Sequence, residues 1–239
     1  MLTTDHPLYN SFCQLAGQLR YDHNVAVIGL ISPFSYSGTS HTARELALLA
    51  AQHYSPQGKR VALIDFDLDK PSQKNFFGSA ISQSKYGVLS GPYNATFGQA
   101  PFWQISPEMM GEDQEKSGDK GIAELYLVGE TGLAITGFNW SQLKEGQRAH
   151  IVRSTEYWDA LRAQFAFVVV DCPAFDRNDT ALTLVPDADS IVLVCLPSQA
   201  HDPGQASYSN LIHEQGGICL GQIINAGVPA IGPAQSPAS

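Results

Sequence analysis

The stretch LISPFSYSGTSHTARELALLA, residues 30–50, has the layout of a phosphate-binding loop. An apolar run leads into a loop that contains Gly38, and an alanine- and leucine-rich segment follows. In such loops backbone N–H groups surround the phosphates, and a lysine after the last glycine binds the β- and γ-phosphates. Thr39 stands at the lysine position here. The stretch alone therefore leaves three interpretations open: a nucleotide site, a degenerate nucleotide site or a simple turn.

Apolar runs and helical segments alternate along the rest of the chain. Continuous apolar runs of strand length are typical of parallel strands that are covered on both faces. We predict strands at residues 25–31, 60–67, 165–173, 190–197 and 216–225, and helices at 7–20, 42–53, 151–164 and 205–215. This alternation predicts an α/β fold with a doubly wound, mostly parallel sheet flanked by helices.

The length and composition favour a single large domain. The chain has 239 residues, of which 44% are apolar and 15% charged, so it can bury a sizeable core. We place that domain at residues 1–228. Residues 91–121 show little periodicity and many Gly, Pro, Ser and charged residues, so we expect a flexible insertion there. The Pro/Ala/Ser-rich residues 229–239 are expected to form a loose tail.

Charge and cysteine usage narrow the function classes. A formal net charge of -9 argues against non-specific nucleic-acid binding, which needs a basic face. The four cysteines share no metal-ligand or C-x-x-C spacing, which favours reduced, buried thiols. We see no signal-peptide pattern at the N-terminus, and the apolar runs are shorter than the ~20 residues of a membrane span. A cytoplasmic protein is expected.

Aspartates follow two of the predicted strands. Asp65 and Asp67 end the second strand, in IDFDLD, and Asp171 ends the next motif, in VVVDCP. Ligands of parallel α/β sheets lie beyond the carboxyl ends of the strands. Carboxylates there, beside a phosphate loop, hold Mg²⁺ or orient an attacking group. One such aspartate is more often a cap, but the three together favour a nucleotide site.

The order of these motifs resembles that of the bacterial tyrosine autokinases that partner polysaccharide co-polymerases. These belong to the superfamily of septum-site and partition ATPases with a deviant phosphate loop. The resemblance rests on VALIDFDLDKPSQKNFFG (61–78), FAFVVVDCPAFDRNDTALTLVPDADSIVLVCLP (165–197) and LIHEQGGICLGQIINAG (211–227). YGVLSG (86–91) resembles the family's next short helix, and LYLVG (125–129) the strand after it. The resemblance implies a P-loop NTPase-like fold.

The resemblance also implies roles for individual residues. The nucleotide-binding positions would be Ser32, Gly38, Thr39, Ser40 and Asn225. Mg²⁺ would be held at Ser40, Asp65 and Asp171, and an active enzyme would use Asp65 and Asp67 in catalysis. The cofactors would be ATP and Mg²⁺.

The phosphate loop departs from the family pattern. In SPFSYSGTS (32–40), Ser35, Tyr36, Ser37 and Thr39 replace proline, glycine, glutamate and lysine. Loss of the lysine removes a charge-assisted contact worth about 1.5–3 kcal/mol, and residues 24–42 contain no lysine that replaces it. Tyr36 places a β-carbon where glycine permits positive φ, so it should strain or block the loop. We expect weak nucleotide binding and impaired catalysis.

Two further family features are missing. Active members of the family carry three charged residues on the first helix, which pack neighbouring subunits into a ring. These positions align with Asn10, Cys13 and Ala16 here, so all three charges are missing. The family's C-terminal tyrosine cluster has no counterpart, since the last tyrosine is Tyr208. The three losses together favour a non-catalytic paralogue. We interpret His41, at the start of the predicted helix, as a solvated residue.

Three functions remain open. The first is a pseudokinase-like adaptor or regulator that binds a membrane polysaccharide co-polymerase or a related export protein, and so lies peripherally at the inner membrane. It could form homo- or hetero-oligomers. The second is an active ATPase or protein-tyrosine kinase with an unusual loop. The third is a partition-type positioning ATPase, which the acidic charge and the lack of a basic amphipathic tail disfavour.

Overall fold

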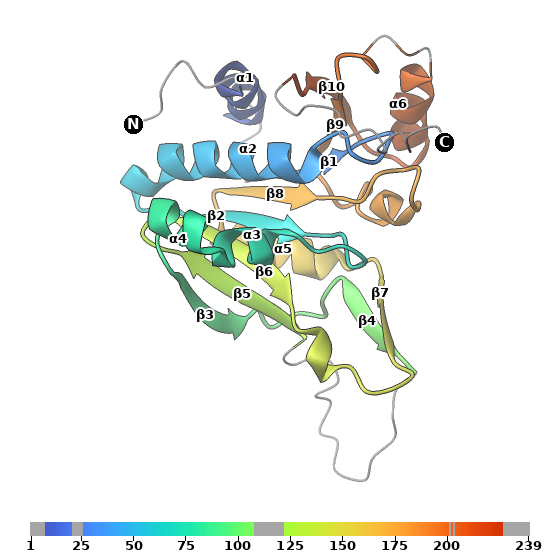
Figure 1. Ribbon diagram of the computed structural model, residues 1–239. Helices are drawn as coiled ribbons and strands as arrows, with labels where there is room; N and C mark the ends of the chain where they lie inside the picture. The colour runs from blue at the N-terminus through green and yellow to red at the C-terminus, as the bar shows by residue number, and fades with distance from the viewer. Residues whose placement is uncertain (1–7, 21–25, 108–121, 201, 203, 227–239) are drawn as a thin grey trace, which may run out of the picture.

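An eight-stranded sheet forms the centre of the computed structural model, which describes residues 8–20, 26–107, 122–200, 202 and 204–226 (Figure 1). The strand order is β10-β9-β1-β8-β2-β6-β5-β3. The strands from β10 to β6 are parallel, and β5 and β3 extend the sheet in antiparallel fashion. Their bounds are β1 Ala26–Ile31, β2 Val61–Asp65, β3 Leu89–Asn94, β5 Ala123–Val128, β6 Leu133–Phe138, β8 Phe167–Asp171, β9 Ser190–Cys195 and β10 Cys219–Ile224.

Helices cover both faces of this sheet. Their bounds are α1 Tyr9–Arg20, α2 Thr39–Tyr54, α3 Gln73–Gly78, α4 Ala80–Tyr86, α5 Thr155–Gln164 and α6 Gln205–Glu214, with 3₁₀ turns η1 Ser55–Gln57, η2 Trp140–Gln142 and η3 Thr180–Thr183. One apolar core contains side chains of α1, α2 and α3, and the other contains side chains of α5 and α6. The predicted doubly wound, mostly parallel α/β fold is confirmed.

The two cores explain why the central strands are apolar throughout. In β8, Val168 and Val170 pack into the core beneath α5, while Phe167 and Val169 pack into the core beneath α2. All four side chains are fully buried. Burial of each such side chain is worth about 1.5–3 kcal/mol. Asp171 is therefore attached to a strand that is held firmly from both sides.

The structure corrects the expectation for residues 91–107. This segment contains the end of β3 and the strand β4, Trp103–Ser106, which pairs with β7, Arg148–Ile151, in a second, antiparallel sheet. Phe102 and Trp103 anchor it because both are fully buried. β3 is an exposed edge strand, so its sequence lacks an apolar period. Residues 108–121 and the predicted tail lie outside the described residues.

Three smaller expectations also change. YGVLSG (86–91) is not a helix: it contains the last residue of the short helix α4, a two-residue link and the first three residues of β3. The helix expected from residue 151 begins at Thr155, because Arg148–Ile151 pairs with β4. β6 was not predicted, although its side chains are all buried. LYLVG does form a strand, within β5.

None of the helices in the described ranges is long and apolar enough to cross a membrane.

Candidate functional site

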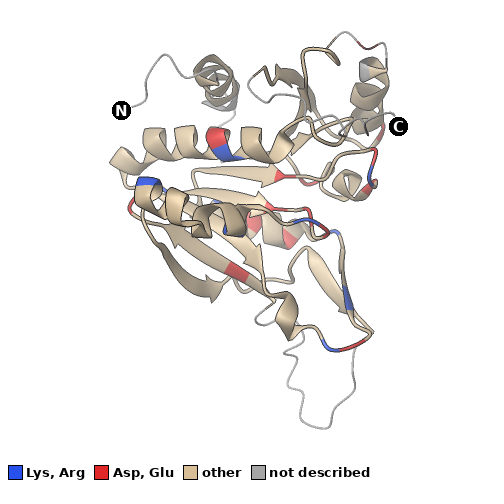
Figure 2. Cartoon of the chain, in the orientation of Figure 1, with Lys and Arg blue, Asp and Glu red and all other residues tan. Residues whose placement is uncertain are grey.

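The predicted site residues gather at one edge of the sheet. β8 and β2 point toward the N-terminal end of α2 (Figure 1), and acidic residues follow both strands (Figure 2). Asp65 and Asp171 are direct neighbours across the parallel β2–β8 pair. The phosphate loop, residues 32–38, joins β1 to α2 at the same edge. Parallel packing therefore brings the three motifs together, as ligand sites of such sheets require.

The phosphate loop is tied together by its own polar groups. The hydroxyls of Ser32 and Ser37 both donate to the Phe34 carbonyl oxygen, at 2.9 and 2.7 Å. Asn225 Nδ2 donates to the Ser37 carbonyl oxygen at 3.1 Å, so Asn225 also reaches the loop. Gly38 caps α2 in the left-handed conformation, with φ of 81°. The loop is thus a defined turn in front of a helix N-terminus, a position that favours anions.

Tyr36 has a strained backbone but an exposed ring. Its φ is 63°, in a left-handed region that costs an L-residue about 1–2 kcal/mol. The predicted strain is therefore present. The side chain is 79% exposed, so the ring lies mostly in solvent at the rim of the loop rather than inside it.

A carboxylate from another loop binds the phosphate loop. Asp176, which follows β8, accepts from the backbone N–H of Ser35 at 2.8 Å and from the Ser35 hydroxyl at 2.7 Å. Asp176 lies within the motif at residues 165–197, but no local pattern predicts that its carboxylate reaches Ser35, 141 positions away. It ties the segment after β8 to the phosphate loop and adds a negative charge next to it.

The Asp67 carboxylate forms an ion pair with an arginine. Both carboxylate oxygens of Asp67 accept from the Arg177 guanidinium, with Nη2–Oδ1 at 2.9 Å, and Oδ1 also accepts from the Lys70 N–H at 3.1 Å. The hydrogen bond to Asp67 raises the pKa of Arg177. A carboxylate held by two parallel N–H donors is a poor proton acceptor until the pair opens. Arg177 lies in the same motif, but no local pattern predicts its pairing with Asp67, 110 positions away.

Asp65 and Asp171 are almost fully buried, each with 1% of its surface exposed. Asp65 Oδ2 accepts from the N–H groups of Ser72 and Gln73 at 2.7 and 3.0 Å, and Asp171 Oδ2 accepts from Gln73 Nε2 at 2.7 Å. Burial raises the pKa of Asp171 to about 6. Burial, together with the charge of Asp171, raises the pKa of Asp65 well above its usual range.

A buried arginine and glutamine support the two carboxylates. Gln73 is completely buried, and its Oε1 accepts from Arg44 Nε at 3.0 Å. Arg44, on α2, is 7% exposed and its guanidinium lies 3.6 Å from the centroid of the Phe76 ring. Burial lowers the pKa of Arg44, while the charges of Asp171 and Asp65 act in the opposite direction. Arg44 thus supplies positive charge near two buried acids.

The two carboxylates are chemically suited to Mg²⁺. Oδ1 of Asp65 and Oδ1 of Asp171 are buried and make no hydrogen bond to any residue that the structure describes. Mg²⁺ prefers oxygen ligands of this kind and usually needs only one or two carboxylates. Ser40 lies close to Asp171, whose pKa it acts to lower. In the part of the chain that the structure describes, no group of three or more His, Cys, Asp and Glu side chains is placed to hold a metal.

Two clefts open at this edge of the sheet. The smaller, of about 240 Å³, lies over the phosphate loop and is lined by residues that include Thr39, Ser40, His41, Lys70 and Arg177. Residues 24–42 contain no lysine, as noted above, but Lys70 and Arg177 bring positively charged side chains to this cleft. They come from segments that are distant from the loop in sequence.

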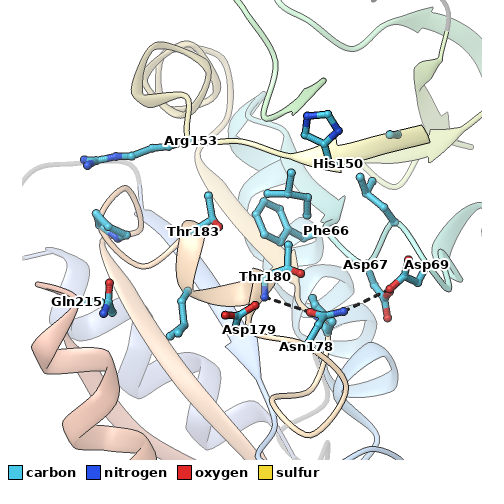
Figure 3. A pocket seen from close by; sticks show the side chains of 16 residues that line it. Phe66, Asp67, Asp69, His150, Arg153, Asn178, Asp179, Thr180, Thr183 and Gln215 are labelled. Atoms are coloured by element: carbon cyan, nitrogen blue, oxygen red, sulfur yellow. Dashed lines mark hydrogen bonds between the residues drawn. The ribbon is translucent and has the colours of Figure 1, made fainter. Parts of the chain in front are cut away.

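The larger cleft, of about 700 Å³, lies between the end of β2, β7 and the segment after β8. Figure 3 shows Phe66 and Thr180 in its middle and His150 on the β7 side. Arg153 lies on the side away from Asp67 and Asp69. Asn178 Nδ2 donates to Asp69 at 3.3 Å. Asp67 lines both clefts, so it stands at their border.

The fold is similar to that of bacterial kinase domains. The kinase domain of VpsO matches with 19% identity and a TM-score of 0.55, covering 92% of each chain. The kinase domain of the Escherichia coli tyrosine kinase ETK matches with 13% identity and a TM-score of 0.55, covering 96% of this chain and 80% of ETK's. The BceF tyrosine kinase domain matches with 18% identity and a TM-score of 0.54, covering 91% and 76%.

No protein-family model matches the sequence, and no curated protein is significantly similar to it. At these levels of identity the structural matches establish the fold. The chain therefore has a P-loop NTPase-like α/β fold, similar to that of bacterial tyrosine kinase domains.

Proposed function

We propose that this protein is a catalytically impaired, kinase-like protein of exopolysaccharide or capsule export. It binds the cytoplasmic part of a membrane polysaccharide co-polymerase, or a related export protein, and acts there as an adaptor or regulator. In this proposal the chain is one domain over residues 1–228, it is held at the inner membrane through its partner, and it binds ATP and Mg²⁺ weakly.

The observation that carries the proposal is the state of Asp67. Both of its oxygens are bound by Arg177, in a pair whose side chains are only 11% and 22% exposed. In the kinase interpretation Asp67 is a catalytic carboxylate that must be free to act on the attacking group. Thr39 at the lysine position removes the charge that stabilises the transferring phosphate. Two parts of the machinery are therefore impaired at the same time.

The first helix supports a mode of assembly that differs from the family's ring. Ala16, one of the three positions where the family carries a charge, is 8% exposed and packs in the core beneath α1 and α2. Phe12 packs edge-on against Phe167 of β8, with ring centroids 6.1 Å apart. A charged side chain at Ala16 would have to leave this packing. We infer that any partner binds another surface.

The test is turnover in the presence of ATP and Mg²⁺. Phosphate release and transfer of labelled phosphate to protein should both stay at the level of the Asp65→Asn variant, which removes a proposed metal ligand. Turnover in the wild type that Asp65→Asn abolishes would overturn the proposal. Co-purification with a two-helix membrane protein encoded beside it tests the adaptor role, and failure of the two to associate would count against that role.

The second candidate is an active ATPase or protein-tyrosine kinase. The observation in its favour is the pair of buried oxygens on Asp65 and Asp171 that have no hydrogen-bond partner among the described residues and are suited to a catalytic cation. In this candidate Arg177 would leave Asp67 when the substrate binds. The same turnover assay separates the candidates.

A further inference from the structure

We propose that Lys70 and Arg177 replace the missing lysine of the phosphate loop and give the cleft its affinity for the phosphates of a nucleotide. The proposal rests on the proposed function, in which nucleotide is bound without being turned over. It names the residues that hold the phosphates and the chemistry by which they do so.

Lys70 and Arg177 both lie at the cleft over the phosphate loop. Lys70 follows β2 and Arg177 follows β8, and both line the cleft of about 240 Å³ over the phosphate loop. Thr39 and Ser40, the first residues of α2, line the same cleft. The two cations therefore face the helix N-terminus, where backbone N–H groups favour an anion.

The balance of charge at this cleft is set by Asp67, Lys70 and Arg177. Arg177 is paired with Asp67, and its Nη2 also lies 3.9 Å from Oδ2 of Asp69, which does not line this cleft. The Lys70 ammonium is exposed and forms no ion pair or hydrogen bond with any residue that the structure describes. Among the side chains that line the cleft, Asp67, Lys70 and Arg177 together therefore carry one net positive charge. Asp176 accepts two hydrogen bonds from Ser35, and its charge also acts on Arg177.

Asp67 contacts both Lys70 and Arg177. The Lys70 backbone N–H donates to Asp67 Oδ1, and Arg177 binds the same carboxylate, so Asp67 holds both cationic residues together. This arrangement explains why Asp67 is present in a chain that lacks the loop lysine. Here the carboxylate holds the Arg177 guanidinium and the backbone of Lys70, whereas in an active kinase it would act on the attacking group.

The experiment is calorimetric titration of the full chain with ADP and Mg²⁺, compared among matched variants. Lys70→Met should weaken ADP binding about tenfold, since a charge-assisted contact of this kind is worth about 1.5 kcal/mol or more. Lys70→Arg keeps the charge and should bind within about threefold of the wild type. Lys59→Met is the control, because Lys59 is also exposed but precedes β2 at the opposite end of the strand.

Arg177 needs a variant that leaves no unpaired acid. The double change Asp67→Asn and Arg177→Gln preserves net charge and removes the guanidinium. It should also weaken ADP binding about tenfold. The dependence of the ADP Kd on salt should fall in Lys70→Met and stay unchanged in Lys59→Met, because only a charge that contacts the ligand contributes to it.

The proposal is wrong if the wild type binds no ADP at millimolar concentration, or if Lys70→Met and Lys59→Met bind it equally well. Wild-type affinity in the double variant would overturn the role of Arg177. These outcomes differ from failure of the proposed function. Turnover of ATP by the wild type would refute the impaired-kinase function, while the charge assignment would stand.

Discussion

Arg44→Met tests the buried charge network at the centre of the site. Arg44 donates a hydrogen bond to Gln73 and stacks over the Phe76 ring. Its guanidinium also interacts electrostatically with Asp65 and Asp171. Methionine retains the apolar stem but removes the charge, the hydrogen bond and the ring contact. The change leaves two buried acids without their nearby cation.

The magnitude follows from the contacts that are lost. A hydrogen bond from a charged group is worth about 1.5–3 kcal/mol, and a cation–π contact about 0.5–2 kcal/mol. Removing the guanidinium also removes the cost of burying its charge, the same cost that lowers the pKa of Arg44. This gain offsets part of the loss of contacts. A net loss of about 2 kcal/mol at pH 8 is expected, which lowers the Tm of a domain of this size by about 4–8 °C.

The effect should depend on pH. The pKa of Asp171 is about 6 in the folded protein, so at pH 5 most of this carboxyl is protonated and needs no compensating charge. The destabilisation should therefore be larger at pH 8 than at pH 5. Thermal unfolding followed by circular dichroism measures it, with Arg60→Met, an exposed arginine before β2, as the control. Equal Tm losses in both variants, or an effect of Arg44→Met that is the same at both pH values, would refute the reasoning.

Three further changes give separate tests. Thr39→Lys alone should leave ATP-dependent phosphate release at background, because Asp67 remains bound; clear turnover would contradict this. Asp171→Asn should stabilise the protein at pH 8 by up to about 3 kcal/mol and have little effect near pH 4, because the raised pKa of Asp171 costs stability only where the folded carboxyl is charged; urea unfolding at both pH values measures it. Gly29→Ala should destabilise by about 1–3 kcal/mol, since a new β-carbon would lie 2.7 Å from Ile191 Cδ1, whereas Gly17→Ala meets nothing within 4 Å; equal urea midpoints for these two would be the contrary result.

Much of the fold could be predicted from local patterns. Fully buried parallel strands have to be apolar on both faces, so β1, β2, β8 and β9 were visible as continuous runs. β3 and β4 were not, because an edge strand and a small outer sheet carry no such run. β6 is fully buried but lies in a stretch with glycine and threonine, which weakened its pattern.

The candidate site divides in the same way. Ser40, Asp65 and Asp171 were predicted because each sits at a fixed place, the end of a strand or the start of a helix, and parallel strands bring those places to one edge. Asp67 was predicted as well, but its pairing with Arg177 was not. That contact joins residues 110 positions apart.

The sequence by itself determined the alternation of the central parallel strands with helices, the edge of the sheet where a ligand would bind, and the loss of the loop lysine. Only the tertiary structure decided how charge is distributed at that edge. It placed Asp176 on Ser35, Arg177 on Asp67 and Lys70 in the cleft, and it buried Arg44 beside the two acids. The physical reason is that strand ends are set by local apolar periodicity, whereas the side chains of loops are placed by long-range packing that no local pattern records.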